Sequence, residues 1–202
     1  MISRALPLLV LALAVVGCAS TPKTASKDSG PAKKSPSPNR FPLKIALYMD
    51  DDFRQHTYRE RSFSVPLGEW LSRELPSSLE PLFAEIHVVP DQTTLDAEKK
   101  KYQAVLRPQI RFASYHPLFR ERRTLLEPEG KVRIYTDWTL SDPAGRKIWI
   151  REIVGRGEGD DKSRSRLEAA VQAAMADLFK KLHIALTTST RVYNYAYGSP
   201  QR

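Results

Sequence analysis

The sequence contains one cysteine, Cys18, among its 202 residues. A single thiol cannot form a disulfide within the chain, and we expect no cysteine metal ligand either. The folded part of the protein must therefore be held together by packing and hydrogen bonds, without covalent cross-links.

Motifs of enzyme active sites are also missing. The four histidines are scattered, and no two have the spacing that places metal ligands on one face of a helix. No Gly-x-Ser-x-Gly segment indicates an activated serine. Gly155, Gly157 and Gly159 lack the Lys-Ser/Thr ending of a P-loop and the third glycine of a dinucleotide fingerprint. We interpret residues 155–161 as a loop, and we expect no catalytic residues, no metal and no cofactor.

An acidic cluster, Asp50–Asp52, could bind a cation or take part in acid–base chemistry. Successive side chains of an extended segment point in opposite directions, so three neighbours converge only if the loop curls. A solvated loop is therefore the favoured interpretation, and the acid–base alternative stays open.

The N-terminal apolar segment, Ala5–Val16, follows Arg4 and falls short of the roughly 18 residues needed to cross a bilayer. Its length is typical of the apolar part of a secretory signal. It ends in Val15-Val16-Gly17-Cys18, in which a small residue directly precedes the cysteine.

This ending resembles the lipobox of bacterial lipoproteins. The resemblance implies cleavage before Cys18 and acylation of that residue, with palmitate among the possible chains. Ala19, rather than an aspartate, follows the cysteine. In Gram-negative lipoproteins this implies sorting to the outer membrane.

We divide the chain into four segments. Residues 1–17 are interpreted as a lipoprotein signal peptide, and residues 18–42 as the lipidated cysteine and a disordered tether rich in Ser, Pro and Lys. Residues 43–190 are expected to form a single domain. Residues 191–202 are a tyrosine-rich tail that either pairs briefly as a strand or stays loose.

The domain is predicted to have an α+β fold with a mostly antiparallel sheet of about five strands, in the order β-α-β-β-β-β-α, and two helices packed on one face. Alternation and turn residues predict strands at 43–49, 86–89, from 104 to 112, at 132–140 and at 147–151.

Helical spacing of apolar residues predicts the two helices. The first begins near Leu67 and should bend or split near Leu75, because Pro76 and Pro81 lie within the pattern. Ser165 and Glu168 have the spacing of a capping box, which predicts the start of the second helix.

The chain is basic, with a formal net charge of +9. Leu106, Ile110 and Phe112 alternate with polar residues and fall on one side of their predicted strand. If Leu106, Ile110, Val132 and Ile134 face the helices, the residues that alternate with them share the other face of the sheet. This candidate binding face comprises Arg107, Arg111, Lys131, Arg133, Tyr135, Lys147, Trp149 and Arg151. Such a face suits phosphate-bearing or acidic partners. A solvated face without a dedicated ligand is the equal alternative.

The order of features resembles the small accessory lipoproteins of envelope assembly and transport. The matching features are the lipobox, the tether, a helix entered through Val65-Pro66-Leu67-Gly68, the hairpin turn Asp142-Pro143-Ala144-Gly145 and an alanine-rich last helix. Such proteins include the lipopolysaccharide-transport lipoprotein, auxiliary lipoproteins of ABC-type lipid transporters, and export-ring lipoproteins with a TolB-N-terminal-like fold. The resemblance implies a non-enzymatic role in which the protein plugs, caps or bridges a larger complex.

We therefore expect a lipoprotein of the cell outer membrane whose domain faces the periplasm. Its expected partners are the membrane, through the N-terminal lipid, a protein of an envelope complex, and lipopolysaccharide or another anionic glycan or lipid. Export makes nucleic acid a poor partner despite the positive charge. The alternative function is a lipid-anchored periplasmic hydrolase of cell-wall or surface polymer that uses carboxylates.

Overall fold

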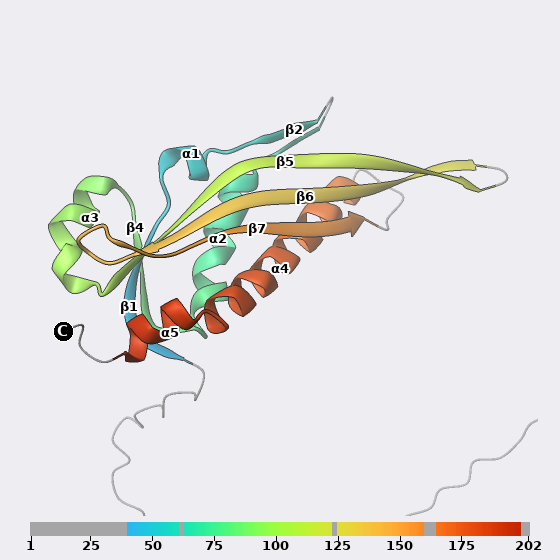
Figure 1. The fold of residues 1–202 in the computed structure, drawn as a ribbon. Coiled ribbons are helices and arrows are strands. Elements are labelled where there is room, and N and C mark those ends of the chain that lie inside the picture. Colours follow the sequence, from blue (N-terminus) through green and yellow to red (C-terminus); the bar gives the residue numbers. More distant parts are fainter. Residues whose placement is uncertain (1–39, 61–62, 123–124, 160–164, 199–202) are drawn as a thin grey trace, which may run out of the picture. The chain divides into compact units, whose positions relative to one another are not determined.

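The computed structural model describes residues 40–60, 63–122, 125–159 and 165–198 (Figure 1). The signal segment, Cys18 and almost all of the predicted tether lie outside these ranges. The strands are β1 (Phe41–Tyr48), β2 (Tyr58–Glu60), β3 (Phe63–Val65), β4 (Phe83–Val89), β5 (Ala104–Arg122), β6 (Leu125–Ser141) and β7 (Lys147–Gly159). The helices are α1 (Asp51–Arg54), α2 (Leu67–Leu79), α3 (Gln92–Glu98), the 3-10 turn η1 (Lys99–Lys101), α4 (Ser165–Thr187) and α5 (Thr190–Tyr197).

Five strands form one sheet in the order β4-β1-β5-β6-β7, which confirms the α+β class. The expectation of a mostly antiparallel sheet is wrong. β1 pairs in parallel with both β4 and β5, whereas β5–β6 and β6–β7 are antiparallel. Parallel neighbours require a crossover connection, and α2 and α3 lie in the two crossovers. Alternation of apolar residues reports burial but not strand direction.

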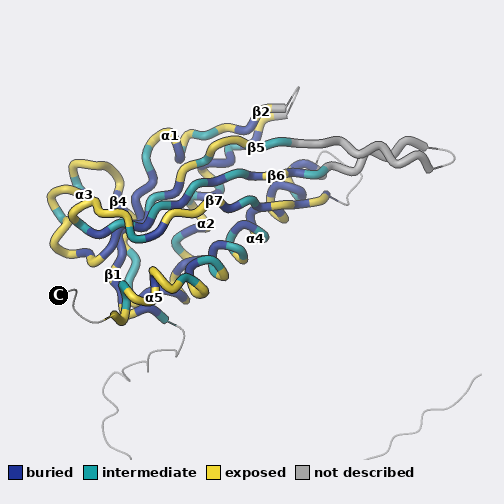
Figure 2. The backbone as a smooth tube through the Cα atoms, in the orientation of Figure 1, coloured by how far each residue is buried: buried dark blue, intermediate teal, exposed yellow. Residues whose placement is uncertain are grey.

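The expectation of two helices on one face is also wrong. α2 and α4 cover one face, while α3 covers the other face at the β1 end of the sheet (Figure 1). Ile45 and Leu47 point into the main core, and Ala46 and Tyr48 point into a second cluster with Leu95 of α3. This two-sided burial explains the run of buried residues at the end of β1 (Figure 2).

α2 runs through Pro76 as one helix, so the predicted split near Leu75 is wrong. Proline inside a helix removes a backbone hydrogen bond and costs about 3 kcal/mol. Leu71, Leu75 and Leu79 are fully buried on one side of the helix, and this packing outweighs the cost. Tertiary contacts here override the local preference.

The predicted loose or strand-like tail is instead helix α5. The side chain of Ser189 accepts a hydrogen bond from the backbone N–H of Val192, which caps the helix, and Val192 is fully buried. Tyr193 and Tyr197, four residues apart, bring their ring centroids within 4.8 Å of each other.

The acidic cluster that was predicted to be a solvated loop is also part of a helix. Asp50 accepts a hydrogen bond from the Phe53 N–H and caps α1, so Asp50–Asp52 do not form an open loop.

β7 continues through the glycines that were interpreted as a loop. A Cβ atom on Gly155 would lie 2.2 Å from the carbonyl oxygen of Ala174, and one on Gly157 would lie 2.0 Å from that of Ala170. These glycines therefore allow α4 to lie directly against the strand (Figure 1). α4 begins at Ser165 as predicted, and Glu168 lies in its first turn. The Ser165 side chain of the predicted capping box lies outside the described part.

Replacing Gly157 by alanine should lower the free energy of unfolding by about 2–3 kcal/mol, because backbone atoms rather than a flexible side chain occupy the space. Urea denaturation measures the change. Glu158→Ala is the matched control on the exposed neighbour, with an expected change within about 0.5 kcal/mol. A loss in Gly157→Ala no greater than in this control would contradict the close packing of α4 on β7.

Candidate functional site

The predicted basic face is interrupted by a bulge in β5 between Ile110 and Phe112. The extra residue reverses the parity of the strand, so Phe112 does not face the helices as expected. Phe112 is 49% exposed and stacks on Tyr135 of β6, with ring centroids 4.1 Å apart. We call this side of β5, β6 and β7, away from α4, the open face.

Five of the eight predicted residues share the open face: Arg107, Arg111, Lys131, Arg133 and Tyr135. Two of their four cationic side chains have ion-pair partners among the described residues. Arg111 forms ion pairs with Asp137 at 3.4 Å and with Glu152 at 2.8 Å, and Lys131 pairs with Glu158 at 2.7 Å. The open face is therefore a mixed surface of cations and carboxylates.

Arg107 is held at the border of the open face by α3. Its guanidinium lies 4.5 Å from the centre of the Tyr48 ring and donates to the Gln92 side chain. Arg133 lies directly opposite Arg156 in the β6–β7 register. Among the described residues, neither Arg107 nor Arg133 forms an ion pair.

The structure places the other three predicted residues elsewhere. The continuous β6–β7 register puts Trp149 opposite the buried Leu140, and Trp149 is only 6% exposed and faces the core. Arg151 lies opposite the buried Trp138, on the side of α4. The assignment of Trp149 and Arg151 to the basic face is therefore wrong. Lys147 lies at the exposed start of β7.

Three hollows follow one another along the free side of β7, between this strand and the α4–α5 segment. The first, of about 670 Å³, is lined by Arg146, Lys147, Ile148, Arg191, Asn194, Tyr195 and Gly198. The second, of about 470 Å³, shares Arg191 with the first and also includes Arg151 and Ser189. The third, of about 360 Å³, shares Arg151 with the second and extends to Arg156. We call these three hollows together the β7 groove.

The β7 groove is strongly cationic. Its lining includes six basic side chains and one carboxylate, Glu152, which already pairs with Arg111 on the open face. The basic residues are Arg146, Lys147, Arg151, Arg156, Lys181 and Arg191. Only Arg146 and Lys181 have ion-pair partners in the described ranges, Asp142 at 3.0 Å and Asp177 at 2.6 Å. Among the described residues the other four form no ion pair, although the Asp177 carboxylate interacts electrostatically with Arg156.

α5 supplies one wall of the groove and is anchored by its tyrosines. The Tyr195 hydroxyl donates to the carbonyl oxygen of Gln103, and the Tyr197 hydroxyl donates to that of Arg40. Burial, and then the nearby Asp142 carboxylate, raises the pKa of Tyr195. The phenol therefore stays protonated as a donor. Arg191 and Arg146 were missed by the sequence reasoning because α5 was not predicted.

The far part of β7 is covered by two side chains of α4. Lys181 donates to the carbonyl oxygen of Val154 at 2.9 Å, and Asp177 accepts from the backbone N–H of Arg156 at 2.8 Å. Burial raises the pKa of the Asp177 carboxyl, but the hydrogen bonds from Lys181 and Arg156 outweigh it and hold the pKa below the usual value. These groups satisfy backbone atoms that no strand covers.

A smaller hollow of about 340 Å³ at the end of β1 contains the acidic residues that sequence reasoning left open. It is lined by Asp50, Asp52, Phe53, His56, Gln109, Ile110, Arg111 and Asp137. Asp50 caps α1, and Asp137 pairs with Arg111. Burial lowers the pKa of His56. In the described ranges, no three His, Asp or Glu side chains are placed to hold a metal ion.

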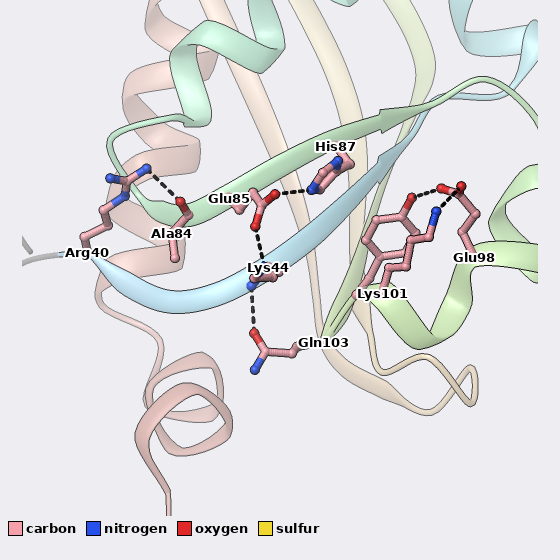
Figure 3. A network of polar contacts seen from close by, with 9 residues as sticks. Arg40, Lys44, Ala84, Glu85, His87, Glu98, Lys101 and Gln103 are labelled. Atoms are coloured by element: carbon pink, nitrogen blue, oxygen red, sulfur yellow. Dashed lines mark hydrogen bonds and ion pairs between the residues drawn. The ribbon is translucent and has the colours of Figure 1, made fainter. Parts of the chain in front are cut away.

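A polar network on β1 and β4 is structural (Figure 3). Glu85 accepts from Lys44 at 2.7 Å and contacts His87 at 2.6 Å, and the Lys44 hydrogen bond, followed by that of His87, lowers the pKa of Glu85. The Arg40 guanidinium donates to the carbonyl oxygens of Phe83 and Ala84. These contacts join the first described residues of the chain to the edge of the sheet.

Asp177→Asn should destabilise the protein at neutral pH by about 1–2 kcal/mol, because it removes a charge that two donors stabilise. The folded-state pKa is lowered, so this stability is present above the unfolded value of about 3.9 and is lost as the pH falls through the folded pKa. Urea unfolding at pH 7 and at successively lower pH measures the difference between wild type and variant. Asp96→Asn on exposed α3 is the control, and a pH-independent difference for Asp177→Asn would contradict the assignment.

No protein-family model matches the chain, and no curated protein matches it by sequence. Its fold resembles that of a neuraminyllactose-binding hemagglutinin homolog from Helicobacter pylori, with a TM-score of 0.53 and 13% identity over 82% of this chain and 98% of that chain. A Xanthomonas campestris protein is less similar, with a TM-score of 0.48 and 10% identity over 74% of this chain and 87% of that one. The solved structures also include a minor lipoprotein from Acinetobacter baumannii, with a TM-score of 0.38 and 13% identity over 71% of this chain and 90% of that one. At these identities the first likeness shows the fold alone, and the weaker two carry no argument about this chain.

Proposed function

We propose that this protein is a lipid-anchored accessory subunit of a bacterial envelope complex, attached to the outer membrane with its domain in the periplasm. In this role it catalyses no reaction and binds an anionic partner through the β7 groove. The proposed anchor is Cys18, on the basis of its lipobox-like context. Within the described ranges, every helix is too short or too polar to span a bilayer.

The observation that carries the binding role is the charge of the β7 groove. Lys147, Arg151 and Arg191 line adjoining hollows without a carboxylate partner among the described residues. Each guanidinium offers a planar set of donors that fits carboxylate or phosphate oxygens. Gathering such cations in one groove costs repulsion that a bound anion would relieve. Arg133, which lies opposite Arg156 in the β6–β7 register, adds on the open face a further cation that forms no ion pair with the described residues.

The hydrolase alternative has less support from the geometry. A carboxylate pair for polymer hydrolysis would have to come from the hollow at the end of β1, where Asp50, Asp52 and Asp137 gather. Asp50 is used as a helix cap, and Asp137 is paired with Arg111. A binding role therefore fits the described side chains better.

Cys18→Ala should abolish metabolic labelling of the protein with radioactive palmitate, because no other cysteine can accept the acyl chain. The variant should remain unprocessed or become soluble in membrane fractionation. Labelling that persists in Cys18→Ala would contradict the anchor. Replacing Ser20 by alanine, two residues away, is the control and should leave labelling unchanged.

Reversing two groove charges, in Lys147→Glu with Arg191→Glu, should weaken binding of the full-length lipidated protein to poly-L-glutamate and to lipopolysaccharide micelles. The expected loss of affinity is at least about tenfold at 0.15 M salt, where diffuse attraction is screened beyond about 8 Å. Fluorescence anisotropy measures the affinity, and thermal melting checks that the variant is folded.

The matched control is Lys99→Glu with Lys100→Glu, which changes the net charge equally on the exposed turn η1. Equal loss in the groove and control variants would mean diffuse attraction and would overturn the proposal. Arg133→Glu tests the open face separately, since its side chain lies on that face.

A further inference from the structure

β7 is the last strand of the sheet, and no strand lies on its other side within the described ranges. In an antiparallel ladder, alternate residues direct their backbone N–H and C=O groups toward the partner strand, and the others direct them away. The Val154 carbonyl and the Arg156 N–H bind side chains of α4, so they point away from β6. The register with β6 is uninterrupted from Trp149 to Gly159, and Ile150 and Glu152 lie four and two residues before Val154. Their backbone N–H and C=O groups therefore also point away from β6.

The outward groups of β7 fall into two parts. At Val154 and Arg156 they are covered by Lys181 and Asp177. At Ile150 and Glu152 the described residues provide no such cover. Proteins usually protect a sheet edge with charged side chains, bulges or a covering element, because open backbone groups pair with other chains. Here the protection stops halfway along the strand.

The side chains around the uncovered part suit a peptide ligand. Ile150 and Ile184 are 54% and 52% exposed, and they lie on the strand and on the wall of the groove. The hollow of Arg146, Lys147 and Arg191 continues from the same stretch of β7. An extended chain lying along β7 would therefore meet free backbone groups, two apolar side chains and then a cluster of cations.

We infer that an extended acidic segment of a partner protein adds to the sheet along β7 at Ile150–Glu152 and places carboxylates in the hollow of Lys147 and Arg191. This inference rests on the proposed function and names the class of its partner. Backbone groups that repeat every second residue match another peptide chain, which is the mode of strand addition known for other recognition domains. A sulfated or carboxylated polysaccharide would satisfy the cations but not this repeat.

The first test uses a peptide of alternating glutamate and valine with the full-length lipidated protein. Two further peptides carry N-methyl groups on either the glutamates or the valines, because the N–H groups of the two sets point to opposite sides of an extended strand. One methylated peptide should lose at least about tenfold in affinity and the other should bind like the parent. The N–H groups of Ile150 and Glu152 should become protected from hydrogen exchange when the parent peptide binds.

The second test changes the protein. Ile150→Pro removes an outward N–H without breaking a bond to β6, and Ile150→Ala is its control because it keeps that N–H. Proline should lower the peptide affinity by at least about tenfold more than alanine does. Binding of dextran sulfate, a polyanion without amides, should be the same in both variants.

The inference is overturned if both methylated peptides bind like the parent, or if proline and alanine at position 150 have equal effects. The methylated peptides need only the wild-type protein, so a poorly folded proline variant does not remove the test. If dextran sulfate binding still depends on Lys147 and Arg191 in that case, the groove remains an anion site and the proposed function stands. If no polyanion depends on these two residues, the proposed function itself fails.

Discussion

The close contact between α4 and β7 determines where the candidate site can form. Gly155 and Gly157 leave no side chain between the helix and the strand, so carbonyl groups of α4 lie where Cβ atoms would otherwise be. This contact places Lys181 and Asp177 against the backbone of β7. It also sets the direction in which the chain leaves α4, and α5 then brings Arg191 beside Lys147. The groove is thus a consequence of helix-on-strand packing.

Two basic surfaces on one sheet differ in how their charge is compensated. On the open face, Arg111 of β5 pairs with Asp137 of β6 and Glu152 of β7, and Lys131 of β6 pairs with its cross-strand neighbour Glu158. These opposite charges offset one another, and exposed pairs of this kind contribute little to stability or binding. In the β7 groove, Lys147 and Arg151 of β7 and Arg191 of α5 have no such ion-pair partners in the described ranges. Net charge alone therefore does not locate a binding site, whereas the pairing of charges does.

Local patterns predicted individual elements well and their relations poorly. The hairpin around Asp142–Gly145 was predicted from its turn residues, and the structure shows why: Asp142 accepts from the backbone N–H groups of Ala144 and Arg146, and Gly145 has a φ of +86°. The prediction of the basic face depended on strict alternation of side chains along each strand, and it holds only where that alternation continues. The bulge near Arg111 reverses the alternation in β5, because a shift of one residue moves every later side chain to the other face. The register shift beside Leu140 separates Lys147 from Trp149 and Arg151, which keep the register of the rest of β7.

The sequence by itself determined the α+β class, the order of the long strands and the two main helices, because these follow from periodic burial and from turn residues within one segment. It also carried the lipobox-like ending at Cys18, on which the proposed anchor rests. Only the tertiary structure decided that β1 is flanked in parallel by β4 and β5, that Pro76 stays inside a single helix, and that residues 190–197 form α5. Those outcomes depend on buried contacts between distant segments, such as Leu75 in the core and Tyr195 on Gln103, whose free energy outweighs local preference.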